Sequence, residues 1–176
     1  MNQAIRLEPD NADGYAYRGN VFNITGKYDR AIDDYNEALR LKPEVAQVLS
    51  DRGAAWYFKG EYQKAIADYD QAIRLDPNRA QTYTNRGAAY SKLGRVQPAL
   101  DDDTSAIRID PSRPEYFDNR GLNLAGSGDY ASAIADYDEA IKDYDRAIAD
   151  YDAALKLDPK FQRAYNNRGV ARQGRA

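Results

Sequence analysis

The chain has 176 residues, enough for one ordinary globular domain or one short repeat array. It contains no cysteine and no histidine, which excludes disulfides, thiol nucleophiles, imidazole bases and the usual zinc sites. Lys and Arg (25) nearly balance Asp and Glu (28), and no apolar run approaches the roughly 20 residues of a membrane helix. We therefore expect neither a nucleic-acid surface nor a membrane span, and the lack of cysteine favours a cytoplasmic protein.

A period of 34 residues runs through the chain and defines its predicted elements. Gly19, Gly53, Gly87 and Gly121 recur at this spacing, each after an arginine. The elements predicted in chain order are a partial second helix at 1–9, repeats at 12–43, 46–77, 80–111 and 114–159, and a partial first helix at 162–172. The incomplete ends indicate a fragment of a longer protein, or ends that stack head to tail between chains.

Each repeat is predicted to form two helices joined by a turn. Gly26 and its counterparts at 60, 94 and 128 favour the positive φ that ends a first helix. In 28–41, apolar residues three, four and seven apart mark one face of a second helix. Gly19 and Ala31 fall where the two helices cross, so a larger side chain at either position would push the backbones apart.

This pattern resembles the tetratricopeptide repeat, in arrays of the bacterial type, over nearly the whole chain. In the second copy the motif residues are Leu49, Gly53, Trp56, Ala65, Tyr69, Ala72 and Pro77. The resemblance implies an all-α fold: a right-handed superhelix of antiparallel helix pairs whose first helices line a concave groove. It also implies protein binding rather than catalysis, without a cofactor or metal.

The third copy has Asp103 where the other copies have tyrosine, next to Asp101 and Asp102. A metal site is one interpretation of this acidic run. A loosened, hydrated seam between helices is the other, and we favour it because consecutive helix residues do not converge on one point.

The fourth copy contains the second helix twice, because residues 144–157 nearly repeat residues 130–143. No Gly or Pro lies near the junction at Lys142 and Asp143, so the sequence predicts one fused helix from 129 to 157. Its first half lacks a following first helix, and its second half lacks its own. We expect a two-fold homodimer, formed by pairing or swapping of the long helices. The residues predicted to carry it are Tyr137, Ile141, Tyr144, Ile148, Tyr151 and Leu155.

The groove implied by the resemblance is a second candidate surface, for a peptide or helix. Its candidate residues are Asn20, Asn23, Tyr57, Phe58, Thr84, Lys92 and Asp118. Tyr57 and Phe58 would anchor a peptide side chain or pack against the next repeat. Chaperone-binding members of the family hold a terminal carboxylate with groove lysines. Those lysines are missing here, which disfavours a chaperone-type clamp.

Arginines at 18, 52, 86 and 120 recur in register with aspartates at 34, 68, 102 and 136. Either the arginines form an anion-binding ladder or each pairs with an aspartate. We favour pairing, because both members recur together.

The leading function is a non-catalytic scaffold that binds protein and associates with itself. One alternative is an RNA-binding helical-repeat module, against which stand the period and the lack of a basic groove. An enzyme using carboxylates or tyrosines is another, but these residues form no convergent constellation in the sequence.

Overall fold

The computed structural model describes residues 8–157, 160, 166 and 170–174, without the side chains at 147, 150, 151, 153, 154 and 157. The described residues form helices and no strands. Successive helices run antiparallel, as the repeat pattern predicts. Residues 1–7 of the predicted helix at 1–9, and most of the predicted helix at 162–172, fall outside the described residues.

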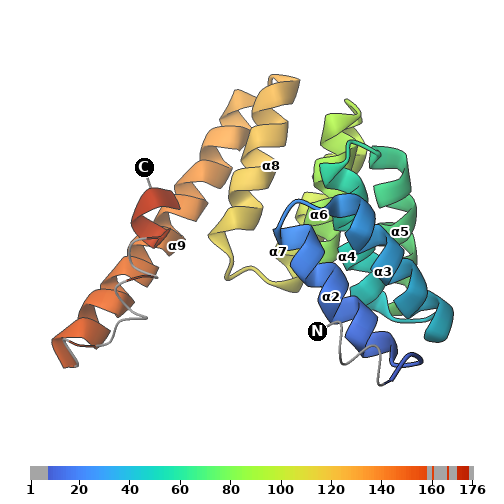
Figure 1. The fold of residues 1–176 in the computed structure, drawn as a ribbon. Helices are drawn as coiled ribbons and strands as arrows, with labels where there is room; N and C mark the ends of the chain where they lie inside the picture. The colour runs from blue at the N-terminus through green and yellow to red at the C-terminus, as the bar shows by residue number, and fades with distance from the viewer. Residues whose placement is uncertain (1–7, 158–159, 161–165, 167–169, 175–176) are drawn as a thin grey trace. The chain divides into compact units, whose positions relative to one another are not determined.

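The chain divides into two compact units, residues 1–102 and 103–176. The helices of the first unit are α2 (Ala12–Ile24), α3 (Tyr28–Leu41), α4 (Ala46–Phe58), α5 (Tyr62–Leu75) and α6 (Ala80–Lys92). From α2 to α5, each helix packs against the helix that follows it (Figure 1). The boundary between units falls inside α7 (Val96–Ile109).

The core of the first unit forms where small and aromatic residues meet at helix crossings. Ala31, Tyr35 and Ala38 of α3 are almost fully buried and lie three or four residues apart, on one helix face. A side chain at Gly19 of α2 has no room there, because its Cβ would lie 2.7 Å from the Tyr35 ring. The turn after α2 ends at Gly26, whose φ of +72° is the left-handed conformation that glycine adopts without strain.

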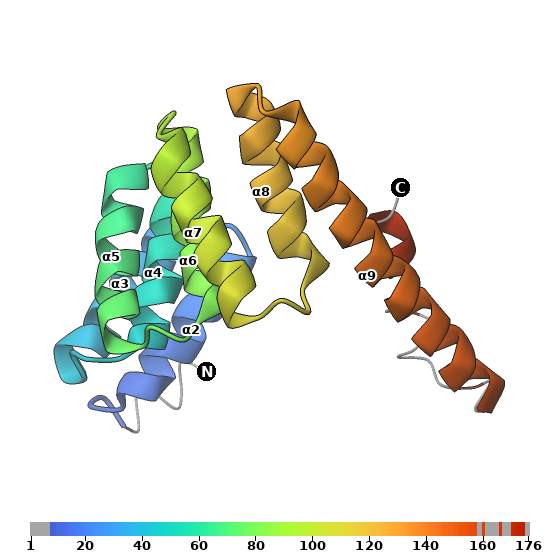
Figure 2. The ribbon, with the colours of Figure 1, turned by 180° about the vertical axis from the view of Figure 1, so that it is seen from behind.

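The second unit contains α8 (Pro114–Ser127) and the long α9 (Tyr130–Leu157), which lie side by side (Figure 2). The fused helix predicted from the duplicated segment is confirmed, because α9 passes through Lys142 and Asp143 without a break. At the crossing with α8, Gly121 meets Tyr137 as Gly19 meets Tyr35. The helical pattern of one repeat is therefore reproduced in α8 and the first half of α9.

The predicted hydrated seam at Asp103 is wrong. Its side chain is only 1% exposed, and Asn123 Nδ2 of α8 donates a hydrogen bond of 2.7 Å to its Oδ2. A buried carboxylate needs such a donor. The departure from tyrosine is thus accommodated by a polar partner on the neighbouring helix.

Candidate interaction surfaces

The recurrent arginines make bidentate ion pairs within each repeat. Arg52 Nε and Nη2 donate to Asp68 at 2.8 and 2.6 Å, while its Nη1 reaches back 2.8 Å to Asn36 of the preceding second helix. The other three arginines pair with Asp34, Asp102 and Asp136 in the same way. This geometry favours the pairing interpretation over an anion-binding ladder, because the guanidinium groups are already engaged.

The same arginines also contact the preceding repeat, where the residue facing them on its second helix is polar. Arg86 Nη1 contacts Asp70 of α5 at 2.5 Å, in the position that Asn36 occupies on α3. Burial raises the pKa of Asp102, and the hydrogen bond from Arg86 opposes that rise. These pairs therefore set the register between helices rather than present charge to a ligand.

One face of α9 is apolar and uncovered. Tyr130, Ile134 and Ile141 are 66%, 60% and 40% exposed, and their spacing of four and seven residues places them on one side of the helix. We call these three residues the α9 face. It lies along the first half of the helix.

The exposure of the α9 face reflects a missing neighbour and not a change of sequence. Ile32 and Ile66 occupy the position of Ile134 in earlier repeats and are only 4% and 9% exposed. Ile32 lies in a buried cluster with Val48 and Ala55 of α4, the first helix of the next repeat. After Ile134 the chain continues as α9 instead of supplying such a helix. The duplication therefore leaves exposed, at Ile134, an apolar position that the first two repeats bury.

The residues predicted for self-association divide between this face and the chain's own core. Ile141 belongs to the α9 face, whereas Tyr137 is half-buried against Gly121 and Ile148 is half-buried. Tyr144 and Leu155 are only 7% and 8% exposed, so the chain itself buries most of both side chains. The side chain of Tyr151 lies outside the described residues.

Tyr144 is covered by its own chain on two sides. Its hydroxyl donates a hydrogen bond of 3.0 Å to Asp118 Oδ2 of α8, and it packs with Phe117 and Ala171. A Cβ at Gly174 would lie 2.5 Å from the Tyr144 ring, so the helical residues 170–174 pass close over it. The residues predicted for self-association did not include Tyr130 and Ile134. These two occupy the same repeat positions as Tyr28 and Ile32, and that correspondence is the signal that identifies them.

Several predicted groove residues are engaged within the chain. Asn20 Oδ1 accepts a 2.6 Å hydrogen bond from the Tyr35 hydroxyl, Thr84 is buried, and Asp118 accepts from Tyr144. Burial raises the pKa of Asp118, while the bond from Tyr144 lowers it. Asn23 is half-buried, and its Oδ1 has no hydrogen-bond partner among the described residues.

Phe58 and Lys92 are the exposed members of the predicted groove set, and Tyr57 is half-buried. Phe58 is 60% exposed and stacks on Tyr28 with ring centroids 5.5 Å apart and planes 12° apart. Tyr57 meets it edge-on, also at 5.5 Å.

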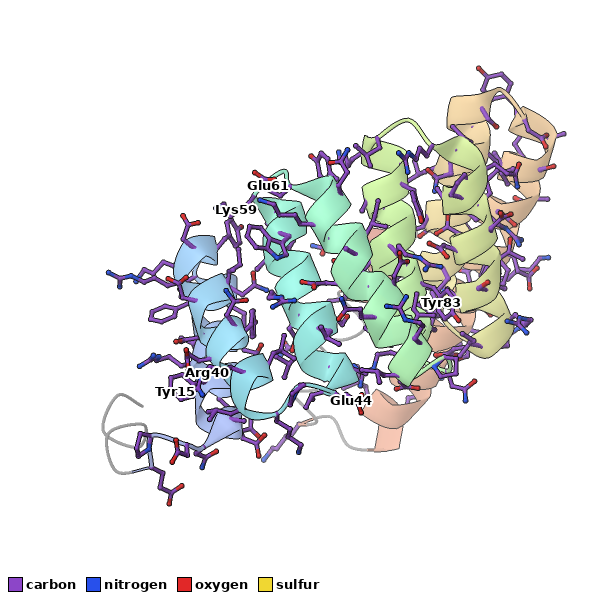
Figure 3. The ribbon with its side chains drawn as sticks, turned by 90° about the vertical axis from the view of Figure 1, so that its right-hand side faces the viewer. Tyr15, Arg40, Glu44, Lys59, Glu61 and Tyr83 are labelled. Carbon is purple, nitrogen blue, oxygen red and sulfur yellow. The ribbon has the colours of Figure 1, made fainter. Side chains whose placement is uncertain are left out.

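A hollow beside Phe58 carries more positive than negative charge. It is lined by Gly26, Lys27, Tyr28, Asp29, Arg30 and Lys59, and Lys59 forms an ion pair with Asp29. Figure 3 shows Lys59 and Glu61 at this end of the helix pairs, with Arg40 and Glu44 at the other. The turn end of α2 to α5 thus combines an exposed aromatic ring with a basic rim.

Neither a metal site nor a membrane span is evident in the part of the chain that the structure describes. No three acidic side chains there are placed to hold a metal ion together. None of the helices described is both long enough and apolar enough to cross a membrane.

The fold defines a helical-repeat protein built from successive antiparallel helix pairs. Models of the tetratricopeptide repeat match residues 12–45, and models of the TPR repeat match 55–94 and 142–174. The chain belongs to the tetratricopeptide repeat family, whose members are generally non-catalytic and mediate protein–protein interaction.

Solved structures of MamA share this fold. A crystal structure of MamA has a TM-score of 0.77 at 22% identity, covering 82% of this chain and 85% of that one. MamA 41-end from Desulfovibrio magneticus RS-1 has a TM-score of 0.74 at 20% identity, covering 78% of each chain. At these identities the likeness shows the fold alone. No curated protein sequence matches the chain.

Proposed function

We propose that the chain is a non-catalytic scaffold that associates with a second copy of itself through the α9 face, forming a homodimer. The observation that carries this proposal is the exposure of Ile134 at a position that is buried in the first two repeats. An apolar stripe that the fold elsewhere covers with a helix is a surface suited to a helical partner.

The α9 face supplies only part of a stable interface. Fully burying each of its three side chains would contribute about 1.5–3 kcal/mol, and partial exposure and ordering costs reduce that sum. Stable interfaces bury on the order of 1,200–2,000 Å² in total, more than three side chains provide. The partner must therefore lay a whole helix along α9.

Sedimentation of the intact chain and of Ile134→Glu tests self-association. The wild type is expected to sediment above the monomer mass of 19.8 kDa at micromolar concentration, and the variant at that mass. Ile134 is exposed, so the substitution leaves the fold intact, which circular dichroism verifies. A wild type that stays monomeric contradicts the proposal. A point substitution is preferable to deleting 144–157, because that segment contains the buried Tyr144 and Leu155.

A second function, binding of an extended segment of another protein, is favoured by the exposed Phe58. An aromatic side chain held by stacking on Tyr28 is pre-ordered for contact, and Lys27, Arg30 and Lys59 add positive charge at its edge. We propose that this surface takes a peptide that pairs an apolar side chain with acidic residues.

Selection of displayed random peptides on the wild type tests this second function. Enriched peptides should be acidic and should lose binding to Phe58→Ala while retaining it on Leu75→Ala, a matched change at another exposed apolar residue. Equal binding to both variants would place the peptide elsewhere on the chain.

A further inference from the structure

The contact between α7 and α8 follows the same register as the earlier contacts between repeats. Arg120 Nη1 of α8 donates a hydrogen bond of 3.3 Å to Thr104 Oγ1 of α7. Arg52 of α4 makes the corresponding bond to Asn36 of α3, at positions that lie two periods of 34 residues earlier. Asp103 of α7 and the whole of α8 belong to the second compact unit. Residues at equal positions in the period can therefore be compared between this junction and the earlier ones.

At the two earlier junctions, a buried tyrosine shares a cluster with a buried alanine of the next helix. Tyr35 of α3 lies in one cluster with Ala55 of α4, and Tyr69 of α5 lies in another with Ala89 of α6. All four side chains are at most 1% exposed. These clusters are apolar, so the second helix requires only a small apolar residue at this position of the helix that follows it.

The same two positions at the junction of α7 and α8 carry a polar pair. Asp103 stands in place of the tyrosine and Asn123 in place of the alanine, and Asn123 Nδ2 donates to Asp103 Oδ2 at 2.7 Å. Asp103 is 1% exposed, and a carboxylate buried to this extent is costly without donors. The pKa of Arg120 is raised by its hydrogen bond to Asp136 and, to a smaller extent, by the charge of Asp103. Both members of the apolar pair thus differ together, one supplying the acceptor and the other the donor.

Among the first helices α2, α4, α6 and α8, the last is the one with a side-chain donor at this position. Val21, Ala55 and Ala89 occupy it in the other three. Placing α4 or α6 on α7 would set an alanine against Asp103 and remove the bond to its carboxylate. A buried polar group that loses its partner discriminates between binding helices more strongly than a difference in apolar shape does.

We infer that Asp103 and Asn123 are specificity-determining residues, which select α8 as the helix that stacks on α7. Repeats that share one apolar pattern can pair in more than one order, within a chain or between copies. The polar pair fixes the order at this junction, because it penalises a first helix with valine or alanine in place of Asn123. The inference does not rest on the proposed self-association, which concerns the α9 face.

Two substitutions at position 123 test the pair in the intact chain by thermal unfolding. Asn123→Ala gives α8 the residue that α4 and α6 have there, and Asn123→Asp keeps the size of asparagine but replaces the donor by a second carboxylate. The thermal midpoint should fall by about 5 °C in Asn123→Ala and by about 10 °C in Asn123→Asp.

Asn36→Asp is the matched control, because it makes the same change at another contact between repeats. Asn36 accepts a hydrogen bond from Arg52, and an aspartate, Asp70, already stands at this position in the next repeat, where it accepts from Arg86. The midpoint of this variant should stay within about 2 °C of the wild type.

Exchanging the two residues tests whether they act on each other. In the variant that combines Asp103→Asn with Asn123→Asp, the donor and the acceptor change places and the hydrogen bond is restored in the opposite direction. This variant should recover at least half of the midpoint lost in Asn123→Asp. Asp103→Asn alone measures the effect of removing the charge, and the recovery should exceed it. If Asn123→Asp does not fold, folding of the exchange variant, seen by circular dichroism, is itself the recovery.

Two results would overturn the inference. If Asn123→Ala is as stable as the wild type, α7 accepts a helix with the residue of α4 and α6, and the pair selects nothing. If the exchange variant recovers no more than Asp103→Asn gains alone, Asn123 acts through contacts other than the one with Asp103. Neither result depends on whether the chain sediments as a monomer or a dimer, so the proposed function is judged separately.

Discussion

At the scale of single residues, a glycine facing a tyrosine ring determines how closely the two helices of a repeat approach. Gly19, Gly53 and Gly121 each lie where a Cβ would come within 2.7 Å of a ring atom of Tyr35, Tyr69 and Tyr137. Aromatic ring atoms in a packed core cannot retreat without moving the helix that carries them. The recurrence of glycine is thus a packing requirement in all three repeats.

This requirement predicts opposite effects for two glycines of α8. Gly121→Ala should destabilise the chain by about 1–3 kcal/mol through overpacking against Tyr137. Gly126→Ala should stabilise it by about 0.5–1 kcal/mol, because a Cβ there meets nothing within 4 Å and alanine is the better helix former. Urea unfolding of both variants measures the difference, and equal effects would contradict the packing argument.

The hydrogen bond between Tyr144 and Asp118 predicts that the stability lost in Tyr144→Phe depends on pH. The pKa of Asp118 is raised by burial and lowered by the hydrogen bond from Tyr144, so Tyr144→Phe should raise it further. A raised carboxyl pKa means that the folded state binds the proton more tightly, so the group's contribution to stability grows as pH falls from neutral. Tyr144→Phe should therefore cost about 1–2 kcal/mol at pH 7, and less as the pH falls into the range in which the Asp118 carboxyl group takes up its proton.

Urea unfolding at neutral and acidic pH, with an NMR titration of Asp118, checks this expectation. Tyr130→Phe is the matched control, because Tyr130 is exposed on the same helix and its hydroxyl should contribute little. A loss in Tyr144→Phe that is constant with pH would show that the carboxylate is not involved.

At the scale of helices, the arginine–aspartate pairs hold first and second helices in register. Asp34→Ala removes both bonds from Arg18, at 2.7 and 2.6 Å, from a carboxylate that is only 5% exposed. Removing one partner of such a pair should cost about 2–4 kcal/mol. Asp33→Ala, one residue earlier and exposed, should stay within about 0.5 kcal/mol of the wild type. Thermal unfolding of both variants tests the contrast, and similar losses would refute it.

The sequence predicted the positions of the helices better than which of their side chains are buried. The fused helix followed from local chemistry, because nothing between Asp129 and Leu157 interrupts a helix. The burial of Tyr144 could not be predicted, since it depends on a hydrogen bond to Asp118 and on close passage of Gly174. Likewise, the partner of Asp103 is an asparagine twenty residues away on α8, and no spacing rule identifies it.

At the scale of the whole molecule, a period of 34 residues was enough to predict the family and the fold, but not which surfaces stay open. Periodicity assigns the same position to Ile32, Ile66 and Ile134, and only the presence or absence of a following helix separates them. Two of the predicted groove residues illustrate the same point. Asn20 and Asp118 lie on first helices as expected, but both accept hydrogen bonds from tyrosines of their own chain.

Self-association through the α9 face must affect the stability of the whole chain. A partner that binds only the folded state stabilises it by mass action, on the order of 1 kcal/mol for each tenfold rise in concentration above the dissociation constant. For a chain of this size the thermal midpoint should then rise by about 3 °C per tenfold increase in protein concentration. Ile134→Glu should abolish the dependence, while Leu122→Glu, a like change at an equally exposed residue, should retain it. A wild-type midpoint that is independent of concentration would mean that no folded partner binds this face, because an association that buries it cannot leave the unfolding equilibrium unchanged.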